Sequence, residues 1–188
     1  MNMNEVLVGA GLATGHFYHA PAGTPLPEHP FATLDKAWAK VGDITVDGVT
    51  ITTDKSTDNL KNWANKIKRT ILTDHTESVD APVMDTTEAT MKTLFGEENV
   101  KITEATSEHG KLIDVHLSAD DLPEPEAFLF IVKDGEAGVM LGCTKGQITA
   151  LADIALTPTT GVTYDATITG QDDGFHYVID DGEKVVSG

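Results

Sequence analysis

Histidine and acidic side chains are the residues of this sequence that could bind a metal ion or catalyse acid–base chemistry. Only His16 and His19 lie close together. In an extended segment two side chains at that spacing face opposite sides, and the HExxH pattern of zinc hydrolases is missing. The other candidates are three pairs of adjacent aspartates: Asp120-Asp121, Asp172-Asp173 and Asp180-Asp181. None shows the alternating oxygen ligands of a calcium loop, so we predict turns and no metal site.

Nucleophilic and cofactor-binding patterns are equally weak. Gly9, Gly11 and Gly15 follow a short apolar run, but the prolines of HFYHAPAGTPLPEHP forbid the helix that a dinucleotide fingerprint requires. The sequence has no GxSxG or GxxxxGK[ST] motif. The single cysteine, Cys143, lies in the apolar run GVMLGC and is expected to be a small core residue. We therefore expect no enzymatic activity and no cofactor.

The charge of the chain limits its partners. Its 188 residues, enough for one domain spanning 1–188, include 30 acidic and 13 basic residues, a net charge of −17. Such a surface repels phosphates, which argues against sequence-specific nucleic-acid binding. A negative surface suits a channel through which DNA slides, although a need for solubility alone explains the negative charge equally well. We find no membrane-spanning run and no signal peptide, so we expect synthesis in a cytoplasm without a membrane anchor.

One central stretch, residues 44–96, has the clearest local patterns. Asp47-Gly48 between alternating apolar residues predicts a tight hairpin over residues 44–51. A helix is predicted over Thr86–Phe95, capped by Asp85 with Glu88 three residues on, and ended by Gly96. Met91, Leu94 and Phe95 would form its apolar stripe.

The rest of the chain reads mainly as strands. Residues 33–41 carry a short helical stripe ending in Trp38 and Val41, and residues 52–66 fit either a helix or a long hairpin. Strands are expected over residues 112–118, 146–156, 162–169 and 175–179, and a hairpin turns at Asp134-Gly135. Closely spaced strands predict an antiparallel β-sandwich or barrel with one short helix packed on it.

The order of VGDITVDGVTI, KSTDNLKNWANKIKRTILTDHTE and DTTEATMKTLFG, after ATGHFYHAPAGTPLPEHP, resembles the major tail proteins of long-tailed, non-contractile bacteriophages, notably those of actinobacterial hosts. The likeness runs from about Leu12 to Tyr177. It implies a virion protein of tail-tube fold, made in the host cytoplasm, that forms stacked rings, usually hexamers. Through this tube the genome leaves the capsid.

The resemblance also implies which parts of the chain meet other subunits. Residues 1–15 would be a flexible N-terminal arm, and residues 52–66 the tip of a long β-hairpin. Candidate inter-subunit residues are Gly11, Gly15, Lys55, Ser56, Asp58, Asn59, Trp63, Lys66 and Arg69. Candidate acidic residues facing the lumen are Asp114 and Asp165.

The expected partners are other copies of the chain, the tape-measure protein, and the tail-terminator and tail-tip proteins, with DNA passing without specific binding. A cluster of four basic residues is expected to pair with acidic residues across a subunit interface; its members are Lys61, Lys66, Lys68 and Arg69.

Three other functions fit parts of the sequence. The tube subunit of a contractile injection system shares the subunit fold. A monomeric β-sandwich binding module would need an exposed aromatic cluster, for which an aromatic content of 6% gives little material. An enzyme on a β scaffold would need convergent polar residues in a pocket.

Overall fold

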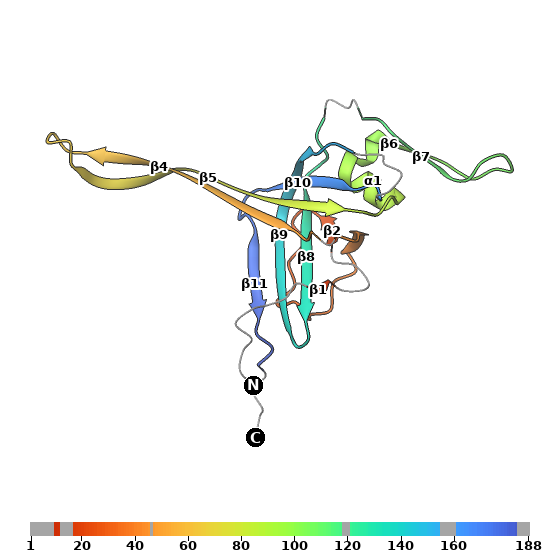
Figure 1. Cartoon of the computed structure of the whole chain (residues 1–188), viewed down its shortest axis with the longest axis horizontal. Coiled ribbons are helices and arrows are strands. Elements are labelled where there is room, and N and C mark those ends of the chain that lie inside the picture. The colour runs from red at the N-terminus through yellow and green to blue at the C-terminus, as the bar shows by residue number, and fades with distance from the viewer. Residues whose placement is uncertain (1–9, 12–16, 46, 118–120, 155–160, 184–188) are drawn as a thin grey trace, which may run out of the picture.

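The computed structural model describes residues 10–11, 17–45, 47–117, 121–154 and 161–183. Strands dominate the described part of the chain (Figure 1). The strands are β1 (Ala10–Gly11), β2 (Phe17–Pro21), β3 (Ala39–Gly42), β4 (Thr50–Lys61), β5 (Ile67–Val83), β6 (Val100–Thr103), β7 (Leu112–Val115), β8 (Glu126–Asp134), β9 (Ala137–Leu151), β10 (Tyr164–Gly170) and β11 (His176–Asp180). Two helical segments, α1 (Glu88–Phe95) and the 3-10 turn η1 (Glu97–Asn99), separate β5 from β6.

Every strand pairing in the described residues is antiparallel. The main sheet has the order β3-β2-β8-β9-β10-β5-β4, with β1 added on β8 and β11 on β9. β6 and β7 form a separate two-stranded sheet. The predicted mainly antiparallel β architecture with one short helix and a long hairpin is confirmed. No helix among the described residues is long and apolar enough to cross a membrane.

Both faces of strand β8 are buried, which explains its continuous apolar run FLFIV. Phe128 and Phe130 point into the larger core cluster, where Phe17 stacks on Phe130 with ring centroids 4.5 Å apart. Leu129 and Ile131 alternate with them and join a second cluster that includes Trp38. The core therefore lies on both sides of the sheet around β8 and β9.

Helix α1 begins later than predicted and has a different cap. It runs from Glu88 to Phe95, and Thr87 is the N-cap, whose hydroxyl accepts a hydrogen bond from the Thr90 backbone N–H at 3.1 Å. Asp85 is not the cap, because its carboxylate accepts a hydrogen bond from the Asp43 N–H at 2.9 Å. The predicted stripe is correct, since Met91 and Leu94 are buried and Phe95 packs on the core.

Two local predictions near the start of the sheet are wrong. Residues 33–41 form a turn and then strand β3, because the Asp35 carboxylate accepts the Ala37 N–H and redirects the chain. Trp38 is buried. The Asp47-Gly48 turn exists, with Gly48 at φ 73°, but its flanks do not pair with each other. Ile44 pairs with Val83 and Thr50 with Asp80, so both flanks extend along β5.

The later strands follow their sequence patterns more closely. The hairpin at Asp134-Gly135 joins β8 to β9, with Asp134 opposite Ala137 and Gly135 at φ 64°. In β10 the expected alternation places Ala166 and Ile168 in the core. β7 ends at Val115, earlier than the predicted end of that strand, and its partner β6 has no clear signal in the sequence.

Cys143 is fully buried in β9, and burial raises the pKa of its thiol from 9.0 to about 11. The thiol of the unfolded chain ionises first, so the stability due to this group is present below pH 9 and is lost as the pH rises toward 11. Between pH 8 and about pH 10 the wild type should lose about 1.4 kcal/mol more unfolding free energy than Cys143→Ala.

Urea unfolding of both proteins at the two pH values measures that difference, because lysines and tyrosines titrate equally in both. An identical pH dependence in the two proteins would contradict the prediction. In the folded wild type, the buried thiol should also react with a thiol reagent only after unfolding.

Candidate functional site: the β4–β5 hairpin

Strands β4 and β5 form a long hairpin that projects from one side of the sheet (Figure 1). Its tip is closed around Asn62, whose carbonyl accepts the Asn65 N–H and whose side chain accepts the Lys66 N–H, both at 2.9 Å. Asn65 has a positive φ of 58°, which asparagine tolerates well among non-glycine residues. The long β-hairpin expected for residues 52–66 is therefore present, although its turn covers only residues 62–66.

We define the hairpin arm as residues 54–76. Among the residues that the structure describes, the two strands of the arm pair only with each other, because the pairing of β5 with β10 ends at Ser78. Every residue of β4 and the first ten residues of β5 are exposed. A two-stranded ribbon without further packing is only marginally stable in water. The hairpin arm is therefore an element that needs a partner.

Large apolar side chains lie exposed on the hairpin arm. They are Leu60, Trp63, Ile67, Ile71 and Leu72, and Trp63 is fully exposed. Cross-strand partners share a face, so Leu72 lies beside Thr57 on one face and Ile71 beside Asp58 on the other. Exposed apolar groups that gather on one element mark interaction surfaces. Both faces of the arm are thus suited to contact with another protein surface.

The hairpin brings together most of the residues predicted to contact other subunits. Lys55, Ser56, Asp58 and Asn59 lie on β4, Trp63 and Lys66 in the turn, and Arg69 on β5. Asn59 accepts a hydrogen bond from the Thr70 hydroxyl at 2.8 Å, which ties the two strands together. The predicted N-terminal contact is separate: Gly11 pairs with Val132 of β8, and Gly15 lies outside the described residues.

The two acidic residues predicted to face the lumen are not brought together. Asp114 is exposed on β7 opposite Lys101, in the small sheet. Asp165 is exposed on β10, on the side of the main sheet that faces away from the larger core. We call that side the hydroxyl face; its described residues include Asp80, Thr149, Asp165, Thr167 and Thr169.

Side chains of the hydroxyl face bond to one another. Thr167 donates a hydrogen bond to the Asp80 carboxylate at 2.6 Å, and the hydroxyls of Thr149 and Thr169 lie 2.8 Å apart. The face is therefore polar, with two carboxylates, Asp80 and Asp165, among the residues named.

A groove that the sequence did not predict lies beside helix α1. Its walls are α1, η1, the segment leading into β8, and parts of β2 and β9. It contains six carboxylates: Glu88, Glu97, Glu98, Asp121, Glu124 and Glu126. No local pattern predicts this groove, because its residues come from separate segments of the chain. The only signal is the density of acidic residues at 97–98 and 121–126.

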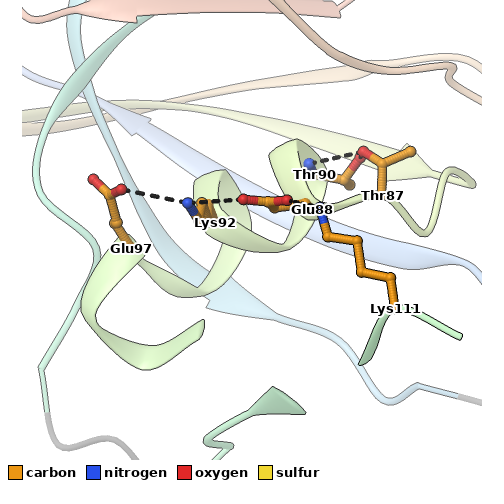
Figure 2. Close-up of polar contacts among 6 residues, drawn as sticks. All are labelled: Thr87, Glu88, Thr90, Lys92, Glu97 and Lys111. Carbon is orange, nitrogen blue, oxygen red and sulfur yellow. Dashed lines mark hydrogen bonds and ion pairs between the residues drawn. The ribbon is translucent and has the colours of Figure 1, made fainter. Parts of the chain in front are cut away.

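Ion pairs along the exposed side of α1 fix one wall of this groove (Figure 2). Lys92 lies 3.0 Å from Glu88 and 3.4 Å from Glu97, and Lys111 also pairs with Glu88. Hydrogen bonds from Lys111 and Lys92 lower the pKa of the Glu88 carboxyl. Across the groove, His19 lies 2.8 Å from Glu126. No group of three or more His, Cys, Asp and Glu side chains among the described residues could hold a metal ion.

The cap of α1 gives a direct test of how this wall is held. Replacing Thr87 by alanine removes the acceptor of the Thr90 N–H, and should cost about 1 kcal/mol of unfolding free energy. Urea denaturation of Thr87→Ala against Thr86→Ala measures this, since Thr86 makes only a 3.4 Å contact with Tyr164. Equal losses in the two variants would contradict the assignment of Thr87 as the cap.

The solved structures that resemble the chain include the following two, and no curated protein matches it. One is a chain of "Virion of native gene transfer agent (GTA) particle", with 11% identity and a TM-score of 0.43, over 77% of this chain and 92% of that one. The other is a chain of "Tail of empty GTA particle computed with helical refinement, C6 symmetry", with 10% identity and a TM-score of 0.43, over 91% of this chain and 98% of that one.

The family comparison is more specific. A family described as "Phage tail tube protein" matches residues 1–181, nearly the whole sequence. This match identifies the chain as a structural, non-enzymatic protein of the virion tail. The chain belongs to the phage tail tube protein family.

Proposed function

We propose that residues 1–188 form one tail-tube domain that assembles through its β4–β5 hairpin into six-membered rings, and that these rings stack into a conduit for DNA. The exposed hairpin arm is the observation that carries this proposal. Its apolar side chains, Trp63 above all, would be buried against other copies. The hexamer follows from the resemblance to phage tail proteins.

The contact proposed for the hairpin is heterologous, because the arm of one copy meets a different surface on the next. Contacts of this kind close into rings when the rotation permits, and otherwise continue as helical filaments. Stacking of the rings into a tube then requires a second contact, between rings. A projecting arm that meets a different surface on the next copy therefore supports a ring better than it supports an isolated dimer.

We further propose that the hydroxyl face lines the lumen. Asp80 and Asp165 would repel the phosphates of DNA, while threonine hydroxyls keep the wall polar without a net positive charge. Asp114 lies on the other sheet, so of the two predicted residues we favour Asp165 as the lumenal one.

Charge reversal tests the lumen assignment. Asp165→Lys places one positive charge in the lumen for every subunit, so symmetry repeats it around each ring. Tubes of this variant should retain DNA, measured as nuclease-protected nucleic acid after mixing with linear duplex. Glu108→Lys is the charge-matched control in an exposed loop. Equal retention by both variants, or none by either, would contradict a lumenal Asp165.

Electron microscopy of the purified chain tests the function itself. Negative-stain images over a range of concentrations, with light scattering in parallel, should show rings or tubes with a central channel and six-fold class averages. The tail-tip complex of the same virus serves as an initiator where the chain alone does not nucleate. Monomers at every concentration, with the initiator present, would refute the proposal.

We propose the non-contractile, long-tailed class, with an actinobacterial host, on the sequence resemblance. The proposed partners are the tape-measure protein inside the tube, and the terminator and tail-tip proteins at its ends. The gene neighbourhood separates this class from a contractile system. A long tape-measure gene without a sheath gene supports the proposal, and an adjacent sheath gene contradicts it.

A further inference from the structure

The outer part of the hairpin, residues 55–69, is basic in a strongly acidic chain. Five of the 13 lysine and arginine residues fall within residues 55–69, where Asp58 is the only acidic residue. The five are Lys55, Lys61, Lys66, Lys68 and Arg69. None of them forms an ion pair with another described residue, whereas Lys40, Lys92, Lys111 and Lys145 all do. These five charges are therefore available to an acidic surface of another molecule.

The groove beside α1 has the opposite charge, and its lining includes two large apolar residues. Glu88 and Glu126 are paired within the chain, but Glu98, Asp121 and Glu124 form no ion pair with any residue that the structure describes. Between these carboxylates lie Pro123 and Leu122, and Leu122 is 54% exposed. The groove thus presents exposed apolar surface next to carboxylates that form no ion pair with the described residues.

The size of the groove favours a protein segment over a small molecule. Its volume is about 1290 Å³, above the roughly 300–1,000 Å³ of most small-molecule sites. The hairpin tip has the matching form, with the fully exposed Trp63 in the turn and Lys66 and Arg69 close to it. An aromatic anchor surrounded by charged residues is a common arrangement at the centre of interfaces.

We propose that the hairpin tip of one copy docks in the groove of a second copy. Trp63 packs on Leu122 and Pro123, and the basic residues of the tip pair with Glu98, Asp121 and Glu124. This inference rests on the proposed self-assembly and names its receiving surface. The hairpin arm and α1 lie on opposite sides of the sheet (Figure 1), so one chain cannot make the contact with itself. The contact is therefore head-to-tail and propagates from copy to copy.

The charge of the docking site makes assembly depend on salt. Exposed ion pairs weaken as the ionic strength rises, whereas the burial of Trp63 is far less sensitive. Charge complementarity acts mainly on the rate of encounter and on the choice of partner. Assembly should therefore slow several-fold between low and high salt.

Reciprocal charge reversal tests the pairing. Lys66→Glu with Arg69→Glu, and separately Glu98→Lys with Glu124→Lys, should each reduce assembly at least ten-fold by light scattering. The chain carrying all four substitutions should recover most of it. Lys36→Glu with Lys101→Glu, two exposed lysines outside the hairpin, is the control and should assemble normally. Loss in the hairpin variant without loss in the groove variant would overturn the docking site.

A disulfide crosslink tests the contact without requiring rings. Ala64→Cys, beside Trp63 in the turn, keeps the aromatic anchor and, mixed with Leu122→Cys, should form a disulfide-linked dimer under copper-catalysed air oxidation. Ala64→Cys mixed with Tyr177→Cys, a position of similar exposure to Leu122, should not. The native Cys143 is buried and does not compete. Equal crosslinking of the two mixtures refutes the docking site, whereas absence of rings in the wild type refutes the proposed function.

Discussion

A chain in which Asn-Gly replaces residues 55–75 is expected to fold and to remain monomeric at concentrations where the full chain assembles. Asp54 and Thr76 are directly paired, so a two-residue turn can join them. The deleted part carries all five basic residues of the hairpin and Trp63, and contributes nothing to the core. Size-exclusion chromatography with light scattering measures the oligomeric state, and thermal unfolding monitors the fold.

The small sheet provides a matched control. Asn-Gly in place of residues 105–110, beyond the paired Thr103 and Leu112, shortens a second exposed connection by a comparable design and keeps Lys111, which pairs with Glu88. This variant should still assemble. Tubes formed by the chain without the hairpin arm would contradict the role of the arm, and so would equal loss of assembly in both variants.

The second large effect concerns the core. Phe17 is fully buried, stacked on Phe130 at 4.5 Å and tilted against Phe128 at 5.9 Å. Phe17→Ala leaves a cavity among these rings and should cost about 3–5 kcal/mol of unfolding free energy. That is a large share of the 5–15 kcal/mol typical of a folded domain. Urea denaturation measures the loss.

An exposed aromatic residue serves as the reference for this experiment. Tyr177 is 56% exposed, and Tyr177→Ala should change the unfolding free energy by only about 0.5 kcal/mol. A loss below about 1 kcal/mol for Phe17→Ala would mean that the core around β2 and β8 is not packed as described.

Local patterns in the sequence identified elements well where one face is buried. Tyr164, Ala166 and Ile168 alternate with polar residues and form β10 as predicted. The same reasoning failed where tertiary contacts set the spacing. Leu34, Trp38 and Val41 have helical spacing because they reach two core clusters from a turn and a strand. The turn at Asp47-Gly48 was predicted correctly, but the residues on both sides of it pair with β5 and not with each other.

The candidate site was predictable only in part. Both faces of the hairpin arm are exposed in the chain, so its strands lack the apolar–polar alternation that a half-buried strand shows. The periodicity of residues 52–66 fits a helix and a hairpin equally well, and the resemblance to a known family favoured the hairpin. The groove could not be predicted from the sequence, because His19, Glu98 and Gln147 come together only in the folded sheet.

Strand β5 runs unbroken from the hairpin tip into the core, and this continuity has a mechanical consequence. The hairpin and the body share one strand, paired with β4 at 12 positions and with β10 at six. A pull along the arm acts on β4 and β5 together and runs parallel to β10, so it loads the hydrogen bonds between β5 and β10 together in shear. They do not open one after another, as in unzipping. A tube joined through such arms would resist stretching when a cell surface or an emptying capsid strains it.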